Sequence, residues 1–79
     1  MNYNQILVGA KGNVLYLGKN PIMVLGLKLM GKRLSDLGND AHEYQLNPKC
    51  TALLNTEAFN KAMAKLSVRI VDWDAECMA

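Results

Sequence analysis

The sequence predicts a small α+β domain in which a β-hairpin is followed by two helices and a C-terminal strand. Two β-prone runs lie near the N-terminus, a long apolar segment with helical periodicity follows an Asn-Pro pair, and a second helical pattern leads into a last β-prone run. We therefore expect the order ββααβ, with a three-stranded antiparallel or mixed sheet and the helices on one face. The length suits one domain, so residues 1–79 are interpreted as a single compact unit.

The first expected element is the hairpin. Residues 3–8 and 13–17 are rich in aliphatic, β-branched and aromatic side chains, and a loop from Gly9 to Gly12 separates them. Glycine can adopt the positive φ that closes a bulged hairpin, so Gly12 suits the end of this loop.

A long helix is expected over residues 21–37. Asn20 can cap it, Pro21 can occupy its first turn without losing a needed N–H, and Gly38 can end it. An apolar stripe at spacings of three and four would face the sheet: Met23, Leu27, Met30, Leu34 and Leu37.

The same helix carries a second apolar face. Ile22, Leu25 and Leu29 lie about 100–120° around the helix from the stripe. A three-stranded sheet cannot cover both faces, so we expect another molecule to cover this one.

Basic residues are concentrated in the first half of the chain. Up to residue 37 there are five basic residues and one acidic residue, a charge of +4, whereas the rest has four basic and six acidic residues, a charge of −2. Lys28 and Lys32 form a ridge on the expected helix, and Arg33 lies about 100° from Lys32. This asymmetry favours self-association or contact with an acidic surface, and it is weaker than the footprint of a dedicated nucleic-acid binder.

The middle of the chain, residues 38–55, is polar. The pair Asn47-Pro48 again marks a start, so residues 48–54 form either one short helical turn or a brief strand. A second helix is expected after Asn55 as its cap. Its apolar positions are Phe59, Ala62, Met63 and Leu66.

The last expected strand runs from residue 68 to about residue 73. Continued alternation would place Asp72, Asp74 and Glu76 on one strand face. Three carboxylates there could contact a basic partner or a divalent cation, but we favour a solvated edge whose charges prevent pairing with other sheets.

Catalytic and cofactor motifs are not matched. Segment 12–19 has five residues between its glycines where a phosphate loop needs four, and no Ser or Thr follows its lysine. His42, Cys50 and Cys77 fit no zinc or nucleophile pattern. We expect no enzymatic activity, no cofactor and no metal.

The expected setting is cytoplasmic. Two cysteines are fewer than small secreted scaffolds usually carry, and the first residues lack the basic start of a signal peptide. The longest apolar stretch, residues 22–30, is far shorter than the roughly 20 residues of a membrane span, so no membrane contact is expected.

These observations favour a small non-enzymatic protein-binding module, a regulator or inhibitor that occupies a surface on a larger macromolecule. Viruses and mobile elements encode effectors of this kind, which would act in the host cytosol, and a homodimer is one form of the interaction. The alternative is a small nucleic-acid-binding protein that uses the basic ridge or the hairpin loop, whose GxxG pattern occurs in nucleotide-binding loops. The candidate partner-binding residues are Ile22, Leu25, Leu29, Lys28, Lys32, Arg33, Asp72, Asp74 and Glu76.

Overall fold

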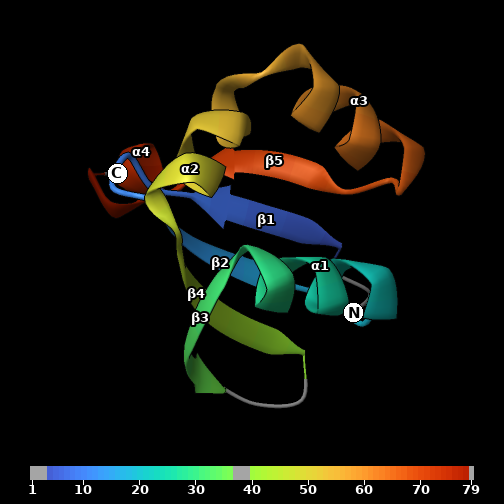
Figure 1. Ribbon diagram of the computed structural model, residues 1–79, viewed down its shortest axis with the longest axis horizontal. Coiled ribbons are helices and arrows are strands. Elements are labelled where there is room, and N and C mark those ends of the chain that lie inside the picture. The colour runs from blue at the N-terminus through green and yellow to red at the C-terminus, as the bar shows by residue number, and fades with distance from the viewer. Residues whose placement is uncertain (1–3, 37–39, 79) are drawn as a thin grey trace.

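A five-stranded mixed sheet forms the centre of the fold (Figure 1). The computed structural model describes residues 4–36 and 40–78, with residues 35, 36 and 76–78 described by their backbone only. Strand β1 is parallel to β5, and the other neighbouring strands are antiparallel. In the order β3-β4-β2-β1-β5, the strands are β1 (Gln5–Val8), β2 (Asn13–Leu17), β3 (Gly31–Asp36), β4 (Ala41–Leu46) and β5 (Arg69–Asp72).

Two helices cover one face of this sheet. Helix α1 (Pro21–Met30) packs against β3 and β4, and helix α3 (Glu57–Lys65) packs against β5. Met23 and Leu27 of α1 and Met63 of α3 are buried in one cluster with alternate side chains of the strands. The strand residues of that cluster are Ile6, Val14, Tyr16, Tyr44 and Leu46.

The predicted hairpin is confirmed. β1 and β2 pair so that Val8 lies opposite Val14, and the N–H of Gly9 donates to the carbonyl of Asn13 at 2.8 Å. Gly12 has a φ of 84°, the positive value expected of it. The first strand begins at Gln5, and residue 3 lies outside the described residues.

The predicted long helix is wrong in its second half. α1 ends at Met30, and Gly31 begins strand β3, where it lies opposite Leu46 of β4. A Cβ at Gly31 would come within 2.6 Å of the Leu46 Cα, so the two backbones approach as closely as only glycine allows. Leu34 therefore lies on β3, half exposed, while Leu37 and Gly38 lie outside the described residues.

The middle of the chain adds a strand that was not expected. β4 lies between β2 and β3, with Tyr44 and Leu46 buried. Three strands in the order ββααβ are therefore corrected to five. The Asn47-Pro48 signal is followed by a short helix α2 (Pro48–Thr51) and a 3-10 turn η1 (Ala52–Asn55), so the helical alternative for residues 48–54 is the correct one.

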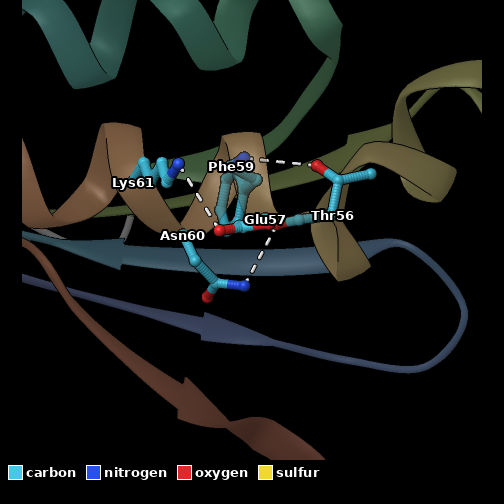
Figure 2. Close-up of polar contacts among 5 residues, drawn as sticks. All are labelled: Thr56, Glu57, Phe59, Asn60 and Lys61. Atoms are coloured by element: carbon cyan, nitrogen blue, oxygen red, sulfur yellow. Dashed lines mark hydrogen bonds and ion pairs between the residues drawn. The ribbon is translucent and has the colours of Figure 1, made fainter.

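The cap of α3 lies one residue later than expected. The Thr56 hydroxyl oxygen accepts the N–H of Phe59 at 3.2 Å (Figure 2). Asn55 cannot take this role because it still belongs to η1. The Thr56 hydroxyl also donates to the Leu53 carbonyl at 2.7 Å, which joins η1 to α3.

The acidic strand face is also wrong. β5 ends at Asp72, and the chain continues as helix α4 (Trp73–Met78). An Asp72 carboxylate oxygen accepts the N–H groups of Asp74 at 3.0 Å and Ala75 at 3.3 Å. These are the bonds of a helix cap, so they turn the chain out of the strand before Asp74 and Glu76.

Alanine substitutions at Gly26 and Gly31 are expected to change the stability in opposite directions. No atom lies within 4 Å of a Cβ built at Gly26, so Gly26→Ala is expected to stabilise the protein by about 1 kcal/mol through helix propensity. Gly31→Ala is expected to destabilise it by about 1–3 kcal/mol because β4 must shift. Urea unfolding of both variants measures these changes, and a Gly31→Ala variant as stable as the parent would contradict the close approach.

Candidate functional site

The outer face of α1, formed by Ile22, Leu25 and Leu29, is exposed. Their exposed fractions are 63%, 60% and 77%, although the same helix buries Met23 and Leu27 on its other side. A helix that is apolar on all sides is normally buried on all sides. Within the part of the chain that the structure describes, the sheet covers only the other side of α1, so its outer face is an exposed apolar surface.

An apolar groove lies between α1 and α3, next to the outer face of α1. Its volume is about 180 Å³. Gly26 opens its α1 wall, because nothing lies within 4 Å of a Cβ there. This α1–α3 groove is lined by Ile22, Met23, Gly26, Leu27, Met30, Phe59, Met63 and Leu66.

Local hydrogen bonds hold the α3 wall of the groove. The Thr56 cap fixes the turn that carries Phe59, and the Asn60 side-chain amide donates to the Thr56 carbonyl at 3.0 Å (Figure 2). Lys61 and Glu57 form an ion pair of 3.4 Å one helical turn apart. Both side chains are exposed, so this pair contributes little to stability.

A buried hydroxyl connects the two walls. Tyr16 is fully buried, and its hydroxyl donates to the Asn4 side-chain oxygen at 2.7 Å. The same hydroxyl accepts the N–H of Asn20, the cap of α1, at 3.2 Å. The Asn4 amide donates at 3.0 Å to the carbonyls of Leu66 and Ser67, where α3 ends. One tyrosine therefore positions the start of α1 relative to the end of α3.

The charged residues of the two groove helices lie away from the groove. Helices α1 and α3 carry three lysines, Lys28, Lys61 and Lys65, and one acid, Glu57, which is already paired with Lys61. All three lysines are exposed. None of them lines the groove, and helical spacing places the three lysines on the faces of α1 and α3 turned away from its lining residues.

The predicted ridge of Lys28 and Lys32 on one helix, with Arg33 beside it, is wrong. Lys28 lies on α1, whereas Lys32 and Arg33 lie on the edge strand β3, opposite Gln45 and Tyr44. Because strand residues alternate between faces, Arg33 lies on the face of the buried Tyr44 and Lys32 on the other face. The three charges do not form one surface.

The acidic candidates lie around a separate hollow of about 360 Å³ at the carboxyl ends of β1 and β5. Asp72 and Asp74 line it, together with apolar residues such as Leu54. Both carboxylates accept backbone N–H groups, Asp72 at the start of α4 and Asp74 from Ala10 at 3.0 Å. The side chain of Glu76 lies outside the described residues. This hollow shares no lining residue with the α1–α3 groove.

The GxxG loop is occupied by bonds within the chain. The N–H of Gly9 donates to Asn13, that of Gly12 to the Gly9 carbonyl at 3.2 Å, and that of Ala10 to the Asp74 carboxylate. A phosphate would need these donors, and Asp74 places a negative charge beside them. The loop geometry therefore disfavours phosphate binding.

His42 lies on β4 and the half-buried Cys50 on α2, so these residues come from separate elements. The side chain of Cys77 lies outside the described residues. Among the side chains that the structure describes, no group of three from His, Cys, Asp or Glu is arranged to hold a metal ion.

Comparison of the chain with protein-family models, curated proteins and solved structures found no match. Among the helices that the structure describes, none has the length and apolar character needed to cross a membrane. The interpretation of the site therefore depends on its own geometry.

The sequence interpretation missed the groove. The helical spacing of Phe59, Met63 and Leu66 indicates the apolar face of a helix but not that they line a groove, and from the sequence Gly26 is either a close backbone approach or a tolerated cost in helix propensity. The available signal was the composition of residues 21–30, where Lys28 is the single charged residue. Such a helix needs covering on several sides, but its neighbour α3 could not be inferred from that pattern.

The tyrosine connection predicts a specific loss of stability. Tyr16→Phe is expected to cost about 1–3 kcal/mol, because it leaves the Asn4 oxygen and the Asn20 N–H without their shared partner. Asn4→Ala removes the same link from its other end, so the double variant should lose less than the sum of the two single losses. Urea unfolding of the four proteins measures this coupling, and additive losses would contradict it.

Proposed function

We propose that the chain is a small non-enzymatic protein-binding module that docks through the outer face of α1 and the α1–α3 groove. It acts as a regulator or inhibitor by occupying a surface on another macromolecule, either a different protein or a second copy of itself. The observation that carries the proposal is the exposure of Ile22, Leu25 and Leu29 on a helix that is already packed against its own sheet.

The magnitude of the apolar contribution supports docking. The exposed parts of the three side chains add up to about two complete aliphatic side chains, and covering them would contribute roughly 3–6 kcal/mol. Association itself costs about 4–15 kcal/mol, so these residues need help from further contacts. The groove beside them supplies more apolar surface for the same partner.

The chemistry of the groove favours binding over catalysis. All eight described lining residues are apolar or glycine, so the lining offers no side chain that can transfer a proton or attack a substrate. A cytoplasmic setting and an origin in a virus or mobile element stay predictions from the sequence.

The central test replaces exposed leucines by glutamate on the proposed docking surface and, as a control, outside it. Leu25→Glu and Leu29→Glu are expected to abolish partner capture from host lysate or, for a homodimer, the concentration-dependent mass in sedimentation equilibrium. Leu53→Glu is the matched control, because Leu53 is 48% exposed on η1 and does not line the groove. All three variants should stay within about 0.5 kcal/mol of the parent in stability, as exposed substitutions do.

Two results would contradict this proposal. Global unfolding of the Leu25→Glu and Leu29→Glu variants would mean that the outer face is part of the internal core. Equal capture by the Leu25→Glu and Leu53→Glu variants would mean that binding uses another surface.

The nucleic-acid alternative is favoured less by the geometry, because the basic ridge is divided between two faces and the loop N–H groups are occupied. We expect no binding of a fluorescent 20-nucleotide RNA or duplex DNA at low salt, measured by anisotropy. Binding whose affinity falls steeply with salt concentration would instead show phosphate contacts and favour the alternative.

A further inference from the structure

We propose that the outer edge of β5 pairs with β5 of a second copy of the chain, so that two sheets join into one across a twofold axis. β5 is the last strand of the sheet, and among the described residues only β1 pairs with it (Figure 1). This edge is separate from the outer face of α1, so the inference goes beyond the proposed function. It is carried by the backbone groups, the exposed isoleucine and the charges of the edge.

The backbone groups on the outer edge of β5 follow from its pairing with β1. The N–H of Arg69 donates to the Asn4 carbonyl at 3.0 Å, and the parallel register continues along both strands. A trans peptide unit directs its C=O and its N–H to opposite sides, and all described peptide bonds are trans. The outer edge therefore carries the carbonyls of Val68 and Ile70 and the N–H groups of Ile70 and Asp72.

This row of groups is complementary to itself. In an antiparallel pair centred on Ile70, the two Ile70 residues exchange both of their hydrogen bonds. In the same register each Asp72 N–H donates to the Val68 carbonyl of the other copy. The N–H of Val68 is not needed, because it already donates to the Met63 carbonyl at 2.8 Å. A second β5 strand therefore pairs every group that the first one leaves free on this edge.

The side chain at the centre of this register is apolar and exposed. Ile70 has an exposed fraction of 38%, although the residue opposite it on β1 is the fully buried Ile6. The twofold axis would place the two Ile70 side chains beside each other and remove both from water. On the other face of the sheet, the aliphatic part of each Arg69 would lie opposite Val71 of the other copy.

Charges at the two ends of β5 select the antiparallel arrangement. Lys65 and Arg69 lie at its start, whereas Asp72 and Asp74 lie at its end, and all four side chains are exposed. Antiparallel pairing brings the basic start of one copy to the acidic end of the other, and it does so twice. Parallel pairing would instead place like charges opposite each other.

The other edge of the sheet is less suited to pairing. β3 has a register shift between Arg33 and Ser35, and such a bulge interrupts the regular row of groups that a partner strand needs. Lys32 and Arg33 also give that edge two adjacent charges of one sign. The register of β5 with β1 is uninterrupted. Because β5 has four residues, the contact is small and we expect a weak dimer.

The dimer would leave the proposed docking surface free. Helix α1 packs against β3 and β4, at the far end of the sheet from β5. Each dimer would therefore present two outer faces of α1. Two linked sites bind a repetitive partner more tightly than one site does.

Sedimentation equilibrium of the full chain from about 10 μM to about 1 mM tests for the dimer. We expect a monomer–dimer equilibrium with a dissociation constant on the order of 100 μM. Ile70→Pro removes an outward N–H but no bond to β1, and proline is tolerated at such edge positions. Ile70→Lys places two like charges opposite each other.

Both Ile70 variants are expected to raise the dissociation constant at least about tenfold. The matched control is Leu34→Lys, because Leu34 is 50% exposed on the opposite edge strand, β3. It should dimerise as the parent does.

Amide hydrogen exchange locates the contact in the unmodified protein. The N–H groups of Ile70 and Asp72 should exchange several-fold more slowly at the highest concentration than at the lowest, because they are paired only in the dimer. The N–H of Arg69 bonds to Asn4 within one copy and should change little. In a dimer of mixed isotope labelling, a contact between the Hα atoms of Arg69 and Val71 of different copies would fix the register.

A charge reversal tests the antiparallel arrangement. Lys65→Glu/Arg69→Glu should raise the dissociation constant at least about tenfold at low salt, since it puts acids at both ends of β5. Lys28→Glu/Lys32→Glu is the control, because it makes the same change in net charge at the other end of the sheet. Equal dimerisation by the two double variants would overturn the pairing of opposite charges.

The outcomes separate this inference from the proposed function. A monomer at every concentration would overturn it, even if the edge took a strand of a different protein. A dimer that survives Ile70→Pro but is lost in Leu25→Glu would overturn it as well, and the docking face would stand. If the dimer depends on Ile70 while Leu25→Glu and Leu53→Glu capture partners equally, the edge stands and the docking face fails. Should an Ile70 variant unfold, the exchange of the Ile70 and Asp72 N–H groups in the parent decides.

Discussion

The arrangement of the two helices depends on one buried hydroxyl. The Tyr16 oxygen joins Asn4 and Asn20, and Asn4 in turn binds the carbonyls at the end of α3. A fully buried phenol without these partners would be costly, so the groups are held at hydrogen-bond distance. Because α1 starts at one end of this chain of bonds and α3 ends at the other, the spacing between the groove walls follows from it.

A second constraint decides how far α1 extends. Gly31 pairs with Leu46 of β4 at an approach that only glycine allows, so the chain has left the helix at this residue and continues as strand β3. This shortens α1 to ten residues and adds two strands beyond β2. The wider sheet supports α1 from below but adds nothing to its outer side, which is why Leu25 and Leu29 stay exposed.

Local patterns predicted the elements whose signals are local. The hairpin with Gly12 and the start of α1 at Asn20 depend on neighbouring residues and were expected from them, and the short helix after Asn47 was one of the two alternatives that its local signal left open. A helix was wrongly predicted over residues 31–37, because the four-residue spacing from Met30 to Leu34 is typical of a helix but also fits a strand with a bulge. Strand β4 was missed because only Tyr44 and Leu46 are buried in a segment that is otherwise polar. The groove required knowing that α3 lies beside α1, which is a long-range contact.

The correction to α1 sharpens the case for docking. On a helix that continued to residue 37, Lys28 and Lys32 would have lain on one ridge and given the outer surface a mixed character. With Lys32 on β3, the helix that remains carries Lys28 as its single charged side chain. This helix has three exposed aliphatic side chains and an apolar groove beside them. Exposing that much connected apolar surface to water is unfavourable. A partner that covered both at once would remove them from water together, which is the physical argument for proposing the outer face of α1 and the groove as a single docking surface.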